Sequence, residues 1–395
     1  YSFDHDGHVL HFKNSYAFEL LSGKFGIPLI RHKRSAWIYY KGVFSKYPFQ
    51  ANLWGLPPAV AKECLLGFIA ASKSRLPAVD KSGRDACGET NFLAWIRMKF
   101  GDGIARHFMI PYNRKFWTVP LQSLNCEWLQ GFIPVPSLGQ LVEGTVENNS
   151  RQFGYNAFFW YPAQGGISCV PGAFAAQLGG SVQTGCRVTA IDIKKKCLYF
   201  GANKRVGFDI LISTIPLPEL ARLIRDLPPG MAGLAAGLRW NSVYNINLGG
   251  RIREDFKRHW VYFPHSDVPF FRVGFSHNFS ADAAPAGKGA MYVEVSYSRY
   301  RPLKAKGLTA KVAAALKKTG FIRSFDDVET VDINDIVYGY PMYNSGYHAC
   351  RSGLEGYLKM NDTLLAGRYG AWRYFSMEDA ILDGKRAAET ALEAM

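Results

Sequence analysis

The chain has 395 residues, more than one hydrophobic core usually serves, so we expect two or three packed domains. Apolar residues make up 48% of the chain and aromatic residues 14%, which excludes a disordered or collagen-like protein. Lysine and arginine number 47 against 32 aspartates and glutamates. The resulting net charge of +15 predicts anionic partners such as phosphates, nucleotides, nucleic acid or acidic lipid.

The seven cysteines are spread along the chain and form no Cys-x-x-Cys pair. This spacing argues against a zinc site and against a secreted disulfide framework, so we expect buried free thiols and a cytoplasmic location. No apolar run approaches the roughly 18 residues that a membrane-spanning helix needs. The chain opens at Tyr1 without a recognisable signal peptide, and we expect its natural start to lie upstream.

The first half of the chain mixes helical and strand patterns. Apolar spacing predicts a short amphipathic helix at 13–26 and helices at 57–72, 91–100 and 103–109, with Pro111 ending the helical stretch. Residues 37–44 indicate a strand that enters a hairpin, with Lys41 and Gly42 at the turn. Residues 151–165 are strand-like, and the small apolar residues at 168–178 favour a helix packed on a sheet.

The second half is richer in strands. Short strands are predicted at 188–193, 197–200 and 209–213, and the continuous apolar run of the last one is typical of a buried parallel strand. Alternation over 238–300 predicts an antiparallel sheet. A helix at 307–318, a short buried strand at 363–367 and a final helix at 378–393 complete the series.

The end of the chain carries the most informative motif. An apolar strand runs into Gly367 and Arg368, and Ser376 stands three residues before Asp379 in the pattern of a capping box. The helix N-terminus that follows could stabilise a phosphate or the negative charge of a reduced flavin. The alternative is a surface helix after a tight turn. The position of Gly-Arg at a strand end, where ligands bind in open α/β sheets, favours the first interpretation.

Two further clusters are compatible with ligand binding. Residues 108–117 interleave aromatic rings with Arg114 and Lys115, which suits a planar anionic ligand but is also typical of core packing. Gly165 and Gly166 could let the backbone approach a ligand or could simply form a turn. The sequence contains no GxGxxG, no P-loop and no GxSxG motif.

Eight motifs occur in an order and at a spacing that resemble the UDP-galactopyranose mutase family, particularly its eukaryotic-type branch, within the flavin amine-oxidase superfamily. They are Asp-Gly-His-Val at 6–9, Tyr-Pro-Phe-Gln-Ala-Asn at 47–52, Ile-Pro-Tyr-Asn-Arg-Lys-Phe-Trp at 110–117, Trp-Tyr-Pro-Ala-Gln-Gly-Gly at 160–166, Val-Tyr-Phe-Pro at 261–264, Pro-Phe-Phe-Arg at 269–272, Gly-Tyr-Pro at 339–341 and Gly-Arg-Tyr-Gly-Ala-Trp-Arg-Tyr at 367–374.

The resemblance implies a mixed α/β fold in three parts. An incomplete Rossmann-type FAD-binding domain would comprise 1–28, 162–215 and 360–395. An inserted helical domain would cover 57–112. An antiparallel sheet domain that binds substrate would comprise 29–56, 113–161 and 216–359. The family's dinucleotide fingerprint lies before the His8 motif, so we expect it upstream of Tyr1.

The same resemblance implies an FAD-dependent isomerase that interconverts the pyranose and furanose forms of a nucleotide-linked sugar. In that family N5 of the reduced flavin attacks the anomeric carbon and expels UDP, without net redox change. One alternative is a flavin oxidoreductase of the amine-oxidase or protoporphyrinogen-oxidase type, and another is a non-enzymatic nucleotide-binding relative. Besides the nucleotide sugar, NAD(P)H or another reductant is a possible partner. No membrane or nucleic-acid partner is expected, because the basic runs at 31–34 and 194–196 are typical of solvated edges or turns.

Roles follow by resemblance, residue by residue. Arg272 would neutralise the diphosphate, and His8 would sit on a flap that faces the flavin. The residues expected to bind substrate are Gln50, Phe108, Asn113, Trp117, Asn156, Tyr262, Tyr340 and Tyr374. Those expected to bind the cofactor are Gly7, His8, Gly367, Arg368, Tyr374, Ser376 and Met377. No metal is expected.

Two departures from the family pattern bear on activity. The family's second diphosphate arginine is replaced by Phe132, and losing such a contact typically costs about 2–4 kcal/mol of transition-state stabilisation. Arg114 or Arg151 could substitute, or the substrate differs. Asp6 replaces the first of two glycines before the flap histidine, and aspartate tolerates a positive φ less well than glycine, so the flap geometry is expected to change.

Overall fold

The computed structural model describes residues 1–73, 90–129, 132–148, 157–201, 204–252 and 257–395. The fold is mixed α/β, as predicted. The chain divides into two compact units. The first unit comprises Tyr1–Val9, Pro28–Ile167 and Asn241–Gly339, and the second comprises Leu10–Ile27, Ser168–Trp240 and Tyr340–Met395.

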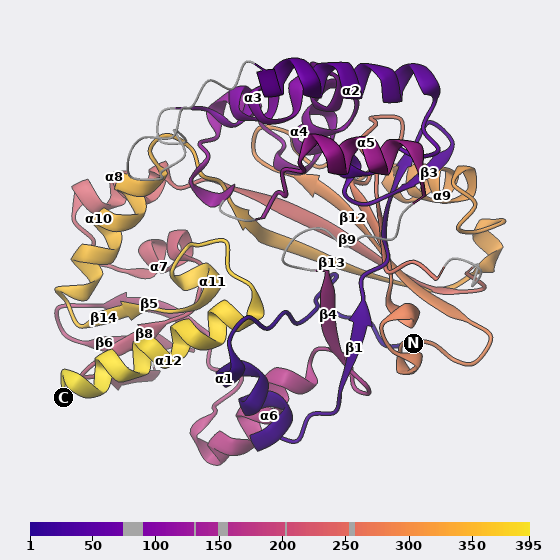
Figure 1. Cartoon of the computed structure of the whole chain (residues 1–395). Helices are drawn as coiled ribbons and strands as arrows, with labels where there is room; N and C mark the ends of the chain where they lie inside the picture. Colours follow the sequence, from indigo (N-terminus) through magenta and orange to yellow (C-terminus); the bar gives the residue numbers. More distant parts are fainter. Residues whose placement is uncertain (74–89, 130–131, 149–156, 202–203, 253–256) are drawn as a thin grey trace. The chain divides into compact units, whose positions relative to one another are not determined.

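A seven-stranded sheet organises the first unit (Figure 1). Its strand order is β13 (Val328–Pro341), β9 (Trp240–Gly250), β12 (Gly289–Tyr297), β11 (Arg272–Phe275), β10 (Trp260–Tyr262), β2 (Ala36–Tyr40) and β3 (Val43–Lys46). The predicted antiparallel sheet over 238–300 and the hairpin at Lys41 and Gly42 are confirmed. Strand β10 also pairs with β2 in parallel, a long-range contact that local alternation does not reveal.

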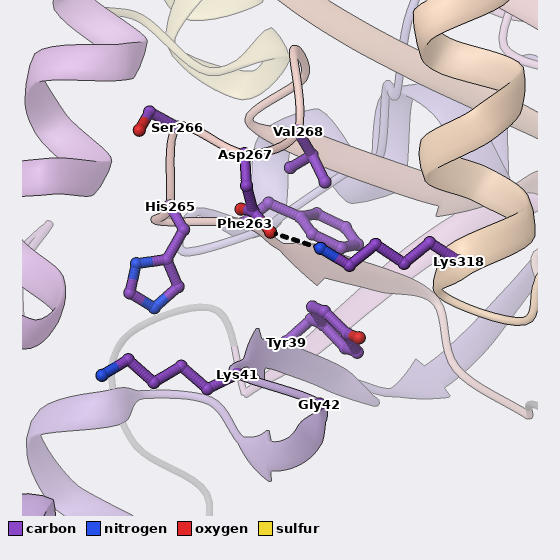
Figure 2. A pocket seen from close by; sticks show the side chains of 9 residues that line it. All are labelled: Tyr39, Lys41, Gly42, Phe263, His265, Ser266, Asp267, Val268 and Lys318. Atoms are coloured by element: carbon purple, nitrogen blue, oxygen red, sulfur yellow. Dashed lines mark hydrogen bonds and ion pairs between the residues drawn. The ribbon is translucent and has the colours of Figure 1, made fainter.

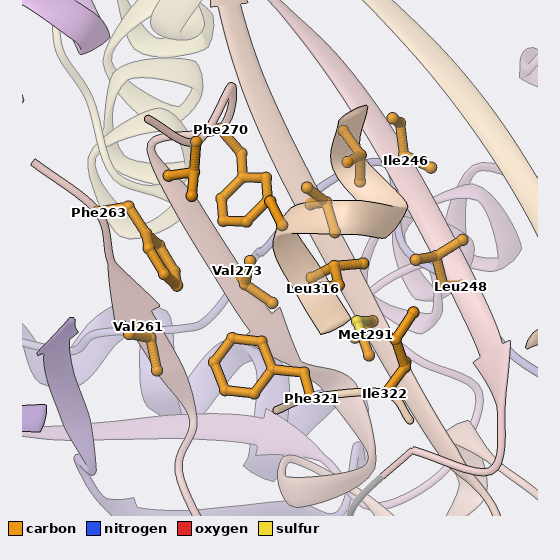
Figure 3. Close-up of a cluster of buried hydrophobic side chains, with 14 of the residues drawn as sticks. Ile246, Leu248, Val261, Phe263, Phe270, Val273, Met291, Leu316, Phe321 and Ile322 are labelled. Carbon is orange, nitrogen blue, oxygen red and sulfur yellow. The ribbon is translucent and has the colours of Figure 1, made fainter. Parts of the chain in front are cut away.

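One face of this sheet packs on the main apolar core of the unit (Figure 3). Alternate residues of the central strands point into it, for example Ile246, Val273 and Val293. Helix α9 (Leu308–Lys318) covers them, because Leu308, Val312, Ala315 and Leu316 recur at helical spacing and form one apolar stripe. Period-two alternation therefore leaves the opposite face of the sheet for polar side chains.

Besides α9, the described part of the first unit contains α2 (Pro58–Lys73), α3 (Phe92–Ile104), α4 (Ile110–Trp117) and α5 (Leu138–Val146). A π-helical turn at Ala105–Met109 joins α3 to α4. The prediction that Pro111 ends the helical stretch is wrong. Proline lies in the first turn of α4, where no N–H donor is needed, so the helix continues to Trp117. Strands β1 (Leu29–Lys33) and β4 (Phe158–Pro162) form a separate antiparallel pair, and residues 151–156 of the predicted strand lie outside the described residues.

The basic run at 31–34 is only partly a solvated edge. Arg31 and Lys33 on β1 are exposed, but Arg34 is buried with its guanidinium 4.8 Å from the ring centre of Tyr47. The run at 194–196 forms a turn, as predicted.

The second unit contains a three-stranded sheet and a parallel strand pair. The sheet consists of β5 (Val188–Asp192), β6 (Cys197–Phe200) and β7 (Lys204–Gly207), and the pair consists of β8 (Leu211–Ser213) and β14 (Thr363–Leu365). The parallel pairing of β8 is confirmed, but its predicted burial is wrong, since Ile212 is 40% exposed. Within the described residues β8 pairs with β14 alone, so its apolar side chains are incompletely covered.

The helices of this unit are α1 (Ser15–Phe18), α6 (Cys169–Leu178), α7 (Leu217–Leu223), α8 (Pro229–Gly237), α10 (Tyr347–Lys359), α11 (Gly367–Gly370) and α12 (Met377–Glu393). The predicted helix at 13–26 is instead a single α-helical turn followed by a π-helical segment at Glu19–Lys24. The strand predicted at 363–367 stops at Leu365, because Gly367 takes a positive φ of 74° and begins α11.

The described residues can be compared with two expectations about the cellular compartment, the burial of the cysteines and the lack of a membrane-spanning helix. Cys64, Cys126 and Cys350 are buried free thiols, whereas Cys186 is exposed, so the prediction of burial fails there. Across the described ranges, no helix combines the length and the apolar character needed to cross a membrane.

Helix α12 begins with the predicted capping box. The Ser376 hydroxyl accepts from the Asp379 amide at 3.2 Å, and the Asp379 carboxylate accepts from the Ser376 amide at 2.8 Å. We expect Ser376→Ala to lower the free energy of unfolding by about 1 kcal/mol in a denaturant titration. The control is Thr390→Ala on the same helix, whose hydroxyl donates to a helical carbonyl. A loss in the control as large as in Ser376→Ala would contradict the capping role.

Candidate functional site

The polar face of the seven-stranded sheet carries two rows of cross-strand partners. One row consists of Asn245 on β9, Glu294 on β12, Arg272 on β11 and Tyr262 on β10. The neighbouring row consists of Asn247, Tyr292, Gly274 and Trp260. Because paired residues of adjacent strands point to the same side, these side chains share one surface.

Arg272, the residue predicted to bind diphosphate, is engaged by acidic side chains. Its Nε and Nη2 both donate to the carboxylate of Glu294, with Nη2 to Oε1 at 2.7 Å. Asp6 Oδ1 lies 4.0 Å from Nη2 of the same guanidinium. The Glu294 side chain is 0% exposed and that of Arg272 is 17% exposed. Burial raises the pKa of Glu294 well above its ordinary value, although the neighbouring Arg272 opposes this change.

Asp6 belongs to an N-terminal segment that several hydrogen bonds anchor. Asp4 accepts from the Tyr161 hydroxyl at 2.7 Å and from the Ile167 amide at 3.0 Å. Asp6 takes a φ of 110°, and its carboxylate accepts from the Gly7 amide at 2.6 Å. His8 is exposed, and its Nδ1 lies 3.3 Å from the Asp6 carbonyl oxygen. The aspartate that replaces a family glycine thus adopts a positive φ, and the expected change in flap geometry stays a prediction.

Tyr292 explains why two of the glycines are needed. A Cβ added at Gly274 would lie 1.9 Å from Tyr292 Cζ, and one at Gly7 would lie 2.2 Å from its hydroxyl oxygen. The buried ring thus fills the space over Gly274 and reaches the N-terminal segment. The missing side chain at Gly7 lets that segment lie close to the Arg272 cluster.

We expect Gly274→Ala to lower the free energy of unfolding by about 2 kcal/mol, because the added methyl group forces the Tyr292 ring or a strand to shift. Thermal or denaturant unfolding would measure the loss. Gly172→Ala in α6 is the matched control, since a Cβ there meets nothing within 4 Å and alanine favours a helix. Equal stability of the Gly274 variant and the wild type would contradict the packing argument.

Aromatic rings surround Tyr262, which is predicted to bind the diphosphate. Its ring centre lies 5.1 Å from that of Tyr47 and 5.5 Å from that of Tyr112. Its hydroxyl oxygen accepts from Trp260 Nε1 at 2.9 Å. Because the oxygen accepts this bond, its own proton can be donated to a different acceptor.

The residues predicted to hold uridine lie deeper in the unit. Phe108 is 4% exposed and stacks with Phe49 at 5.0 Å on one side and Tyr112 at 5.3 Å on the other. Trp117 is 1% exposed and packs edge-on against its aromatic neighbours. Asn113 is also buried and donates to the Met109 carbonyl. Base stacking on these rings stays a prediction, and it requires a neighbouring ring to move.

Gln50, also predicted to lie near the nucleotide, is buried and donates to the Pro134 carbonyl at 2.9 Å. Among the described residues its Oε1 has no hydrogen-bond partner, so this oxygen could accept from a ligand. Asn156 and Arg151 lie outside the described residues. Phe132 is half-buried and Arg114 is exposed. The replacement of the family's second diphosphate arginine by Phe132 therefore stays a departure from the family pattern.

Lys115 has a structural role that its sequence position did not indicate. Its Nζ donates to the carbonyl oxygens of four residues between β10 and β11: Phe263 at 2.9 Å, Val268 and Phe270 at 3.1 Å each, and His265. Burial lowers the pKa of Lys115 to about 7. The carbonyl cage opposes this change, because the ammonium group offers three N–H donors and the neutral amine only two.

The second unit brings together three of the predicted residues. The Arg368 guanidinium lies 4.7 Å from the ring centre of Tyr340 and 5.0 Å from that of Tyr374, and the two rings stack at 5.7 Å. Nη1 of Arg368 donates to the Phe375 carbonyl at 2.9 Å. The buried Nε has no hydrogen-bond partner among the described residues, which fits a polar planar ligand such as a flavin.

The start of α12 is less suited to an anion than its sequence predicts. The amides of Met377 and Glu378 point out of the first turn, as at any helix start. The same turn carries the carboxylates of Glu378 and Asp379, which oppose a negative ligand. The Glu378 carboxylate accepts hydrogen bonds from the backbone amides of Lys13 and Asn14 at 2.7–2.9 Å. The Gly367 amide donates to Asp383 at 2.8 Å.

A separate pocket of about 540 Å³ opens on the first unit (Figure 2). It is lined by Tyr39, Lys41, Gly42, Phe263, His265, Ser266, Asp267, Val268 and Lys318. Lys318 and Asp267 pair at 2.8 Å, and burial lowers the pKa of His265. None of the described residues predicted for the site lines this pocket, so it provides no support for those assignments.

Sequence reasoning missed Glu294, Tyr292 and the cage around Lys115. A signal existed for Glu294, because a lone glutamate within the apolar strand 289–297 falls on the face opposite Val293 and Val295. A charged residue within such a buried strand needs a partner, and Arg272 is on the adjacent strand. No comparable signal pointed to the carbonyl cage around Lys115, because every residue has a backbone carbonyl and the sequence does not indicate which ones a side chain will contact.

Comparison with known proteins relates this chain to flavin enzymes by sequence and fold. The family model for flavin-containing amine oxidoreductases matches residues 96–392. The crystal structure of reduced UDP-galactopyranose mutase is similar with 25% identity and a TM-score of 0.89, covering 98% of this chain and 84% of that one. Putrescine oxidase bound to putrescine has 15% identity and a TM-score of 0.65, with coverages of 98% and 88%. Cyclohexylamine oxidase from Brevibacterium oxydans IH-35A has 13% identity and a TM-score of 0.66, with coverages of 99% and 88%.

Proposed function

The chain belongs to the family of flavin-containing amine oxidoreductases, and from this premise we propose that it is an FAD-dependent isomerase of the UDP-galactopyranose mutase type, of the eukaryotic branch. Family membership implies a flavin cofactor. The proposed reaction interconverts the pyranose and furanose forms of a nucleotide-linked sugar. The similarity to reduced UDP-galactopyranose mutase, at a TM-score of 0.89, supports this choice over the oxidases.

The observation that carries the proposal is the row that aligns Arg272 with Tyr262 on the polar face of the sheet. A guanidinium fixed beside a phenol suits a diphosphate leaving group, because negative charge develops on its oxygens as the bond to the sugar breaks. The Tyr262 hydroxyl oxygen already accepts a hydrogen bond from Trp260 Nε1, so its own proton would be donated to a phosphate oxygen. Arg272 would supply the positive charge, and His8 on the anchored segment would face the flavin.

In the second unit Gly367, Arg368, Ser376 and Met377 are the residues proposed to hold the FAD, with Tyr340 and Tyr374 directed to the substrate. When bound, the reduced flavin would supply the nucleophile for the anomeric carbon. Arg368 is held in place for a ligand by Tyr340, Tyr374 and the Phe375 carbonyl. NAD(P)H or another reductant as a partner and a cytoplasmic location complete the proposal.

The test is turnover of UDP-galactofuranose by the purified protein loaded with FAD. We expect a yellow protein that forms UDP-galactopyranose after reduction with dithionite and forms none while oxidised. Equal activity in the oxidised and reduced forms would contradict the proposed role of the flavin. A yellow, folded protein that neither binds UDP-galactose nor converts UDP-galactofuranose would remove the mutase assignment.

A flavin oxidase is the second candidate, and two observations favour it. Arg272 is already paired with buried Glu294, and Phe132 stands where the family places a second arginine, so the site offers less positive charge than a diphosphate prefers. The oxidases named above share the fold. Oxygen uptake on addition of an amine or a porphyrinogen, together with no response to UDP-galactose, would support this candidate.

A further inference from the structure

Two carboxyl groups meet at one guanidinium in the first unit. Glu294 holds Arg272 through two hydrogen bonds, and Asp6 approaches the same Nη2 to 4.0 Å. Both carboxyl groups therefore lie close to the same guanidinium nitrogen. With both carboxyl groups ionised the three side chains carry a net charge of −1, which opposes the binding of a diphosphate.

The fold maintains this arrangement against backbone strain. Asp6 takes a φ of 110°, in a region that favours glycine. Its carboxylate bonds to the next amide, and its side chain is 9% exposed. Asp6 is therefore fixed beside Arg272 rather than free to turn into solvent.

Two buried carboxyl groups that share one cation do not both ionise readily. Glu294 is fully buried, and this burial holds its pKa well above the ordinary value, with Arg272 opposing the increase and Asp6 adding to it. Among the described residues, the groups around the pair include Arg272, the phenols of Tyr292 and Tyr262, and neutral Asn245. Exposed His8 stands two residues along the N-terminal segment. The pair is thus the group best placed to exchange a proton when charge enters the site.

We infer that Asp6 and Glu294 form a proton-binding pair that sets the effective charge of Arg272, so that a diphosphate group binds there with uptake of a proton. This inference rests on the proposed function for its ligand. A bound dianion raises the proton affinity of both carboxyl groups, and a protonated pair leaves the guanidinium positive. By linkage, the diphosphate binds more tightly as the pH falls.

The first experiment measures binding of UDP-galactose, whose diphosphate diester has no ionisation near neutral pH. Calorimetry in two buffers of different ionisation enthalpy gives the protons taken up per site. We expect uptake of up to one proton by the wild type and a loss of affinity of up to tenfold per pH unit where the pair titrates. In Asp6→Asn we expect no uptake and an affinity about tenfold higher at the alkaline end.

The controls separate the pair from its neighbours. Uptake must survive in His8→Gln, because that imidazole could also bind a proton. It must be lost in Glu294→Gln as it is in Asp6→Asn. Binding by the wild type without proton uptake, or uptake unchanged in Asp6→Asn, would overturn the inference while leaving the mutase proposal standing.

A second measurement does not require a ligand. We expect the infrared spectrum of the ligand-free protein, followed from acid to alkaline pH, to lose a protonated carboxyl band over the same pH range in which calorimetry detects proton uptake on binding. The band should be absent in Asp6→Asn and in Glu294→Gln. Asp267→Asn is the matched control, since Asp267 also pairs with a cation, Lys318, but is exposed. Absence of the band in the wild type overturns the inference. A band without any binding of UDP-galactose removes the diphosphate and the proposed function but retains the proton-binding pair.

Discussion

Arg272→Ala is expected to abolish turnover and to lower the free energy of unfolding by about 3–5 kcal/mol, because Glu294 would remain buried without its cation. Flavin should still bind, since the residues proposed to contact it elsewhere are unchanged. Turnover, flavin absorbance and a denaturant titration measure the three effects. Unchanged turnover in this variant would remove the assignment of Arg272 to the phosphate.

A double variant separates the structural role of Arg272 from its catalytic role. In Arg272→Ala combined with Glu294→Gln the uncompensated charge is gone, so most of the lost stability should return while turnover stays absent. Arg251→Ala is the matched control for an exposed arginine, whose partner Asp327 lies 3.3 Å away, and should cost less than about 1 kcal/mol. Recovery of turnover in the double variant would show that Arg272 acts only through the fold.

Lys115→Met is expected to lower the free energy of unfolding by about 3 kcal/mol. The methionine fits the volume of the lysine stem but leaves four carbonyl oxygens between β10 and β11 without their donor. The last of these carbonyls, that of Phe270, lies two residues before Arg272, so we also expect weaker substrate binding.

The exposed neighbour provides the control for this prediction. Arg114→Met removes a cation from the same turn of α4 and should change the unfolding midpoint little. The two variants are compared by denaturant titration at the same pH. Equal midpoints for the Lys115 variant and the wild type would show that the carbonyls find other donors.

Local patterns predicted the elements that depend on neighbours in the chain. Alternation over 238–300 gave the central strands, the Lys41 and Gly42 pair marked a hairpin, and Ser376 with Asp379 marked the start of α12. These features depend on φ and ψ preferences and on hydrogen bonds that span a few residues. The misplacement of Pro111 has the same origin, because the pattern does not distinguish a helix end from a first turn.

The sequence proposed residue types for the candidate site but not their pairing. Motif order selected Arg272, Tyr262, Arg368 and Tyr374 as functional, and the structure brings Arg368 to Tyr374 and Arg272 to Tyr262. It also places Phe108 between two rings, which a motif cannot reveal because ring contacts depend on packing. Glu294, the partner of Arg272, left a signal as a lone glutamate in an apolar strand, but the strand register that pairs the two residues is not visible in the motifs.

The sequence by itself determined the mixed α/β class, the alternating strands, the capped final helix and the types of side chain available for anion chemistry. Only the tertiary structure decided which charges meet. Strand register sets Glu294 against Arg272, and the anchored N-terminal segment brings Asp6 to the same guanidinium from far along the chain. Register and long-range packing are collective properties of the folded chain, so the effective charge of Arg272 is fixed only once the sheet and that segment are in place.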